Sequence, residues 1–295
     1  MYYKNPGYKI FNWINLFMLF IISLLCIFPV IHILALSFSS AAASSANLVS
    51  FFPVGFTTEA YAKTLQNSDF LSSLTNSIIR VILGVGLGML ITVLTAYPLS
   101  KMDNGQLKGG RIIAWYFVFT MLFSGGLIPS YIVIQKLGLI NSIWALILPG
   151  LVGVWNIILM LNFFRAIPKE LEEACFMDGA GHIRILFNLY IPLSLASIAT
   201  LSLFIAVGHW NSWFDGIIYL SNKEKWPIST LLQTLIVSPD PNKLMNNVDP
   251  GLMENFSART VKAAQIFIGS LPILIVYPFL QRFFIKGIVM GSIKE

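Results

Sequence analysis

Residues 168–196 read PKELEEACFMDGAGHIRILFNLYIPLSLA and lie between two long apolar runs. This polar segment holds four acids, two bases and Gly179 in a chain whose charges are otherwise sparse. Such a concentration of charge is too costly to leave in hydrocarbon, so the segment must lie outside the membrane. The apolar runs on either side of it then decide the fold.

The composition of the chain excludes an ordinary soluble domain. Of its 295 residues, 56% are hydrophobic and only 11% are charged, and the mean hydropathy is +0.76. Soluble domains carry about 25% charged residues. Continuous apolar runs recur along the chain, and helices satisfy their own backbone groups in lipid. The sequence therefore predicts an all-α, polytopic membrane protein.

Six apolar runs predict six transmembrane helices, at residues 14–36, 74–99, 112–127, 143–163, 193–220 and 261–280. The first run has about 23 residues, longer than the roughly 7–15 of a signal-peptide core, so we expect it to be retained. The predicted organisation is a cytoplasmic N-terminus (1–13), a first transmembrane helix (14–36), an extracytoplasmic loop (37–73), a five-helix transmembrane domain (74–280) and a cytoplasmic tail (281–295). Within that domain lie the polar loop 168–192 and a second extracytoplasmic loop, 221–260. A short interfacial helix is expected near residues 59–65.

The orientation follows from the distribution of basic residues. Six spans place both termini on one side, and the segments on that side hold eleven of the nineteen Lys and Arg residues. The opposite loops are longer in total but hold seven. Because positively charged loops stay in the cytoplasm, both termini are expected there.

Two features are expected inside the second span. Gly84 and Gly88 form a small-xxx-small face, which favours close contact with another helix over a nucleotide-binding loop. Arg80 lies near the outer end, where we expect its side chain to reach the lipid headgroups.

The sequence offers little for catalysis or for a resident cofactor. It has no P-loop motif, and its three histidines, at 32, 182 and 209, show no metal-ligand spacing. No pair of acids suited to a proton relay lies within a span, and Asp215 is the one acid at plausible membrane depth. We therefore expect no metal, no cofactor in this chain and no enzymatic activity of its own.

The polar loop 168–192 predicts a helix–turn–helix elbow. Pro168 suits the first turn of a helix, and the glutamates that follow it favour the positive helix end. Gly179 suits the left-handed turn that ends the helix. A second helix is expected from Gly181, closed by Pro192. One interpretation is a connector resting on lipid headgroups, and the other is a docking element for a cytosolic partner.

The same loop resembles the coupling loop of bacterial ABC importer permeases. That pattern is E-A-A, three residues, G, nine residues, then I-x-L-P. Here Glu173, Ala174, Gly179 and Pro192 match it, with Asp178 and Ala180 on either side of the glycine, and Cys175, Leu189 and Ile191 depart from it. Sugar permeases of this type often carry another proline four residues after the last one, where this chain has Ala196. LGLINS at 137–142, Trp210–Asn211 and the tail QRFFIKGIVMG at 281–291 resemble the maltose-permease-like carbohydrate branch. FSGGLIP at 123–129 resembles its oligosaccharide-type sub-branch.

The resemblance implies a type I ABC importer permease fold in a bacterial cytoplasmic membrane. It implies a second, related permease, two copies of a cytosolic ATPase that bind ATP and Mg²⁺, and an extracytoplasmic sugar-binding protein. It also implies that the ATPase-coupling residues are Glu173, Ala174, Cys175, Asp178, Gly179, Ala180 and Pro192. The loop 221–260 would touch the binding protein, although an idle loop would have a similar sequence.

A carbohydrate path is expected where aromatic and hydrogen-bonding side chains gather. The candidates are Trp210, Asn211, Phe214, Asp215, Tyr219 and Tyr131. An interfacial aromatic belt explains the same residues equally well. Two other functions stay open: a secondary transporter or channel that acts alone, and an ABC permease for a non-sugar solute.

Overall fold

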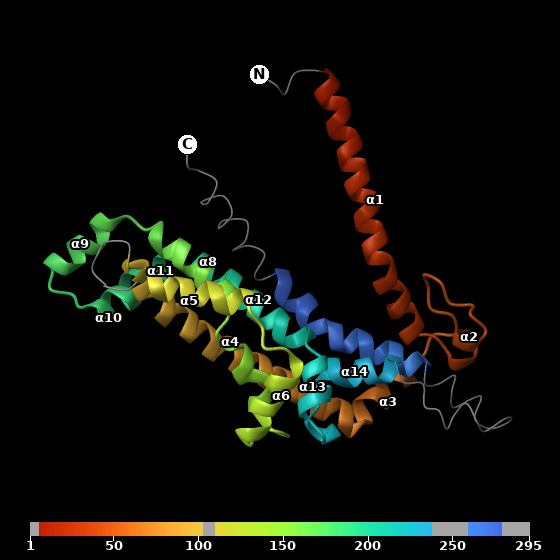
Figure 1. Cartoon of the computed structure of the whole chain (residues 1–295). Helices are drawn as coiled ribbons and strands as arrows, with labels where there is room; N and C mark the ends of the chain where they lie inside the picture. Colours follow the sequence, from red (N-terminus) through yellow and green to blue (C-terminus); the bar gives the residue numbers. More distant parts are fainter. Residues whose placement is uncertain (1–5, 103–109, 238–258, 279–295) are drawn as a thin grey trace. The chain divides into compact units, whose positions relative to one another are not determined.

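The computed structural model describes residues 6–102, 110–237 and 259–278, and it is helical, with no strand in these ranges (Figure 1). It divides into two compact units. One consists of Met1–Phe70 and Thr234–Leu271, and the other of Leu71–Gln233 and Pro272–Glu295. The cytoplasmic tail 281–295, and most of the loop 221–260 beyond residue 237, lie outside the described residues.

The first unit contains α1 (Pro6–Ser37), α2 (Ala41–Ser45) and α3 (Glu59–Gln66). The apolar side chains of α1 are exposed over most of its length, as expected of a helix that faces lipid. At its end, Ala35 and Leu36 pack with Ala43 and Ala263 in a small apolar cluster. The short helix expected near residues 59–65 is confirmed as α3.

The second unit begins in the long helix α4 (Ser68–Ser100) and continues through a series of shorter, bent helices. These are α5 (Gly110–Leu122), α6 (Leu127–Lys136), α7 (Trp144–Ile147), a 3-10 turn (Leu148–Gly150), α8 (Val154–Arg165), α9 (Lys169–Met177), α10 (His182–Ile185), a π-helical segment (Leu186–Tyr190), α11 (Ile191–Leu193), α12 (Leu195–Asn211), α13 (Phe214–Tyr219), a second 3-10 turn (Lys223–Lys225) and α14 (Ile228–Val237). The last residues of α14, from Thr234, belong to the first unit, as do residues 259–271 of a last helix, Arg259–Pro278.

Three of the described helices are long and apolar enough to cross a membrane: Gly7–Ser37, Ser68–Ser100 and Arg259–Pro278. Three bent pairs qualify if each is one span: Trp115–Leu122 with Leu127–Lys136, Trp144–Gly150 with Val154–Arg165, and His182–Leu193 with Leu195–Asn211. The six predicted spans therefore have helical counterparts, and three of them are broken.

The breaks correct two sequence predictions. The run at 112–127 does end at its glycines, but a further helix, α6, follows at 109° where a connecting segment was expected. The run at 193–220 is not one helix, because Ser212 takes an extended conformation (ψ 117°) between α12 and α13. The second helix of the elbow, expected from Gly181 to Pro192, is observed as His182–Leu193. It ends one residue after Pro192, and the 82° bend falls at Ser194.

The close contact predicted for the glycines of α4 is confirmed. A side chain at Gly84 would overlap the His209 ring of α12, and one at Gly88 would lie 3.7 Å from Ile205. The helices α4 and α12 thus approach closely, because neither glycine places a side chain between them.

The apolar core of the second unit adjoins the elbow. Buried side chains of α4, α8, α12 and the segment 185–190 form one apolar cluster, in which Ala96, Met160, Phe164, Ile185 and Leu201 are at most 1% exposed. Figure 1 places α9 and α10 at one end of this unit and α13 toward the other.

Candidate functional site

The elbow consists of α9, the turn at residues 178–181 and α10. Pro168 precedes the first turn of α9 as its N-cap residue, and Asp178 ends the helix. Gly179 adopts φ +76°, and the next residue donates its backbone N–H to the carbonyl of Cys175 at 3.0 Å. Residues that carry a side chain rarely adopt this left-handed conformation, which explains why a glycine is found at this position. The turn confirms the predicted end of the helix.

The outer face of the elbow exposes most of the predicted coupling residues. Glu173, Ala174, Asp178 and Gly179 are exposed, and Cys175 and Ala180 are half-buried. Apolar side chains accompany them, with Met177 88% and Ile183 77% exposed. Pro192 is not part of this face, because it lies in α11, beyond the π-helical segment. The elbow thus presents acids and apolar side chains together on a surface that can receive a partner.

The inner face of the elbow is held by one buried ion pair. Glu172 is the buried residue of α9, at 8% exposure, and it pairs with Lys101, which directly follows α4. Lys101 Nζ also donates to the Tyr190 hydroxyl, which itself donates to Glu172 Oε2 at 3.0 Å. We call Lys101, Glu172 and Tyr190 the joint. Each partner satisfies the others, as a buried charge pair requires.

Aromatic side chains surround the joint. The ammonium of Lys101 lies 4.2 Å from the centre of the Tyr190 ring and 5.2 Å from that of Tyr97. Tyr97 packs edge-to-face against both Tyr190 and Phe164. The electron-rich ring faces stabilise the ammonium of Lys101, whose side chain is 9% exposed.

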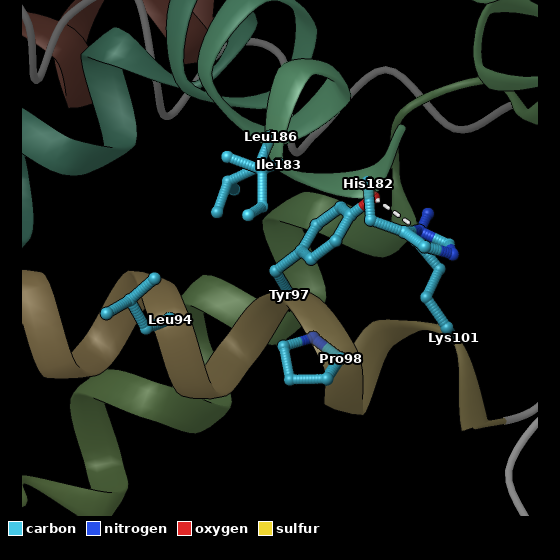
Figure 2. Close-up of a pocket in the computed structure, with 7 residues that line it drawn as sticks. All are labelled: Leu94, Tyr97, Pro98, Lys101, His182, Ile183 and Leu186. Carbon is cyan, nitrogen blue, oxygen red and sulfur yellow. Dashed lines mark hydrogen bonds between the residues drawn. The ribbon is translucent and has the colours of Figure 1, made fainter. Parts of the chain in front are cut away.

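A second contact joins α4 to the elbow at the turn. Figure 2 shows the hydrogen bond between the Tyr97 hydroxyl and His182 Nδ1, at 3.2 Å. His182 also packs edge-to-face on Phe176 of α9. Beside this bond is a largely apolar cavity of about 440 Å³, lined by Leu94, Tyr97, Pro98, Lys101, His182, Ile183 and Leu186.

The joint was not predicted from the sequence. Lys101 entered the sequence analysis only among the basic residues that set the orientation, and Glu172 only among the glutamates that follow Pro168. One signal was present: Glu172 precedes Cys175 by three residues, so both lie on one face of α9, and Cys175 packs against the core. The partner of Glu172, 71 residues earlier in the chain, has no such signal.

A second buried ion pair lies farther along α4, and it corrects the expectation for Arg80. Arg80 is 2% exposed and pairs with Asp215 of α13 rather than reaching the headgroups. Its guanidinium also donates to the carbonyls of Ser212, at 3.1 Å, and Leu146, at 3.5 Å. Asp215 accepts further bonds from the Ser212 hydroxyl and the Gly216 backbone, both at 2.9 Å.

The residues predicted for a carbohydrate path are only partly brought together. Asp215 and Tyr219 line one cavity of about 390 Å³ with Arg80, Asn156 and His209. Tyr131 stacks on Tyr219, with ring centres 6.3 Å apart.

The other predicted path residues lie apart from that cavity's polar lining. Trp210 is buried and lines a separate apolar cavity of about 190 Å³. Asn211 and Phe214 are exposed. Of the residues that the sequence grouped, only Asp215 and Tyr219 therefore line the same cavity.

The fold and the elbow together define a multi-pass membrane permease, and comparison with known proteins specifies the family. A family model described as "Binding-protein-dependent transport system inner membrane component" matches residues 112–290, more than half of the chain. The protein belongs to this family. It is a permease subunit of an ABC importer and has the type I permease fold.

Several relatives match over nearly the whole chain. The polygalacturonan/rhamnogalacturonan transport system permease protein YtcP of Bacillus subtilis (strain 168) is 38% identical, over 97% of this chain and 99% of the relative. Protein LplC of the same organism is 36% identical, over 97% and 95%. A solved structure of a bacterial ABC transporter involved in the import of the acidic polysaccharide alginate is 33% identical, with a TM-score of 0.85 over 95% of this chain and 98% of that one.

Proposed function

We propose that the protein is the permease subunit of an importer that brings an oligosaccharide across a bacterial cytoplasmic membrane. Two similar proteins support a carbohydrate substrate, since one is named for polygalacturonan and rhamnogalacturonan and the other for alginate. A second, related permease would complete the translocation path. An extracytoplasmic binding protein would deliver the sugar, in part through the loop 221–260.

The observation that carries the coupling role is the exposed elbow. Its outer face presents Glu173 and the turn at Gly179, while its inner face is fixed to the body of the second unit. A carboxylate so exposed is free to form a charge-assisted bond with a basic residue of a partner. In this proposal the partner is a cytosolic ATPase, two copies of which bind ATP and Mg²⁺. The elbow and both termini then lie on the cytoplasmic side.

The cavity between Arg80 and Tyr219 is the best-supported part of a sugar path. It offers an aromatic face at Tyr219, with Tyr131 stacked behind it, and polar groups at Asn156 and His209. Sugars are bound by this combination of ring faces and hydrogen-bonding groups. The two charges that line the cavity pair with each other, so they order its wall without adding net charge.

Uptake by cells that lack the native gene tests this function. Cells complemented with the wild-type gene should accumulate labelled oligogalacturonides. Glu173→Ala should reduce uptake at least about tenfold, the loss expected when a charged contact worth about 1.5–3 kcal/mol is removed. Gly179→Asp should also reduce uptake, because a side chain strains the left-handed turn at φ +76°. Glu170→Gln, an exposed acid on the same helix, is the matched control and should transport normally. Immunoblots of membranes check that every variant inserts.

Purification separates this function from a transporter that acts alone. The tagged wild-type chain should retain an ATPase subunit and a second permease, and Glu173→Ala should lose the ATPase. A chain that purifies alone and still transports would contradict the proposed function. Full uptake by both elbow variants would remove the docking role of the elbow.

A further inference from the structure

The inner face of α9 differs from that of an ordinary amphipathic helix. The one side chain it buries is a carboxylate, Glu172, rather than an apolar residue. A short helix held by an ion pair gains little stability from burial, because desolvation offsets much of the attraction between the charges. The ion pair instead fixes the position of α9, because its hydrogen bonds are directional, whereas apolar side chains in contact can shift past one another.

The joint connects α9 to one particular helix. Lys101 directly follows α4, and Tyr97, one turn earlier, contacts both His182 and Tyr190. Pro98 lies between these two contacts and removes a backbone hydrogen bond from the last turn of α4. The elbow therefore contacts the chain on both sides of Pro98, at Tyr97 and at Lys101. Figure 2 shows these three residues.

The rest of α4 is suited to carry a displacement. At 33 residues it is about 50 Å long, and a continuous helix moves as a rod. Its middle is packed closely on α12 at Gly84 and Gly88. Near its other end, the Asn76 side chain donates to the carbonyl of Glu224, in the segment that follows α13.

We propose that Lys101, Glu172 and Tyr190 are positioning residues that transmit movement of the elbow to α4. The two neighbouring glutamates of α9 then have separate tasks. Glu173 contacts the partner on the outer face, and Glu172 passes the resulting displacement inward. This inference rests on the proposed docking of an ATPase at the elbow.

The experiment measures movement at the far end of α4 rather than stability. Thr75 is exposed there and is replaced by cysteine in a chain carrying Cys26→Ser, and the same chain without the Thr75 replacement gives the background labelling of Cys175. The assembled complex in lipid nanodiscs is labelled with a hydrophilic maleimide, with and without ATP and vanadate. With the joint intact, nucleotide should change the labelling rate by about tenfold, within the range usual for coupling between two sites.

Breaking the joint should remove this response without removing the partner. Lys101→Met should reduce the change in labelling rate to less than about twofold, while the ATPase still copurifies and still hydrolyses ATP. Glu170→Gln, which changes an exposed acid of the same helix, should keep the full response. The exchange of charges, Lys101→Glu with Glu172→Lys, should restore part of it.

The outcomes separate the two proposals. A full response in Lys101→Met overturns the joint and leaves the docking function standing. Loss of the ATPase from Lys101→Met also overturns it, because the cluster would then only shape the docking surface. No response in the intact complex also overturns the joint, because α4 then does not move with nucleotide, while the purification and uptake experiments decide the proposed function. If Lys101→Met does not insert, the isosteric Glu172→Gln decides by the same criteria.

Discussion

The helix α4 carries a buried ion pair at each of two levels, and the two pairs are built differently. Near the elbow, the ammonium of Lys101 meets Glu172 and Tyr190, and both charged side chains are about one-tenth exposed. Farther along, the guanidinium of Arg80 meets Asp215, whose side chain is 23% exposed, and two backbone carbonyls. Lys101 connects two elements through its compact ammonium charge, while Arg80 connects the ends of three elements through its planar guanidinium.

This difference indicates what each pair does. Asp215 keeps two hydrogen bonds that do not depend on Arg80, and it borders a cavity. Glu172 has only the joint. The pair at the elbow is therefore the less tolerant of a missing partner, and the pair at the cavity is the more sensitive to the shape of its cation.

The largest expected effect comes from the elbow. Glu172→Leu should lower the stability of the chain by about 3–5 kcal/mol, because it leaves the Lys101 ammonium buried and unpaired. Glu173→Leu, its exposed neighbour, should change stability by less than about 0.5 kcal/mol. Loss of helical circular dichroism during SDS titration in mixed micelles measures both. Equal effects would show that the two faces of α9 do not differ as described.

A smaller effect is expected at the cavity. Arg80→Lys keeps the positive charge and the bond to Asp215, but it cannot also reach the carbonyls of Leu146 and Ser212. The same titration should record a loss of about 2 kcal/mol, the cost of leaving buried acceptors unpaired. If Arg80→Lys is as stable as the wild type, the positive charge alone, and not the planar guanidinium, holds the residues that line the cavity in place.

The smallest effect is expected between the two pairs, where α4 meets α12. Gly84→Ala should cost about 1–2 kcal/mol, because the added methyl group overlaps the His209 ring and forces it to move. Gly86→Ala is the matched control, since nothing lies within 4 Å of the new methyl group. It should be neutral or stabilising by up to about 1 kcal/mol through helix propensity. Melting curves of the purified chain in detergent should separate the two variants.

The elbow could be predicted closely because its signals are local. Pro168 before the helix, acids in its first turn and Gly179 after its end act within a few residues of one another, and all three are observed in α9. The six apolar runs were also recognised, since each consists of apolar residues that follow one another in the chain. The break at Ser212 was not predicted, because it has neither a glycine nor a proline.

The two ion pairs could not be predicted, because each joins residues far apart in the chain. Lys101 and Glu172 are separated by 71 positions, and Arg80 and Asp215 by 135. In the sequence, a charged residue near the end of an apolar run looks the same whether its side chain reaches lipid headgroups or pairs with a buried acid. Only the packing of α4 against α9 and α13 distinguishes these cases.

The sequence by itself determined the membrane class, the number of apolar runs, the elbow with its turn, and the resemblance to ABC importer permeases. Those features depend on composition and on neighbours in the chain. The tertiary structure decided which face of the elbow is outer, which of two adjacent glutamates is buried, and which acid receives each cation of α4. The reason is physical: burial and charge pairing are properties of surfaces in contact, and such contacts exist only once distant segments have packed.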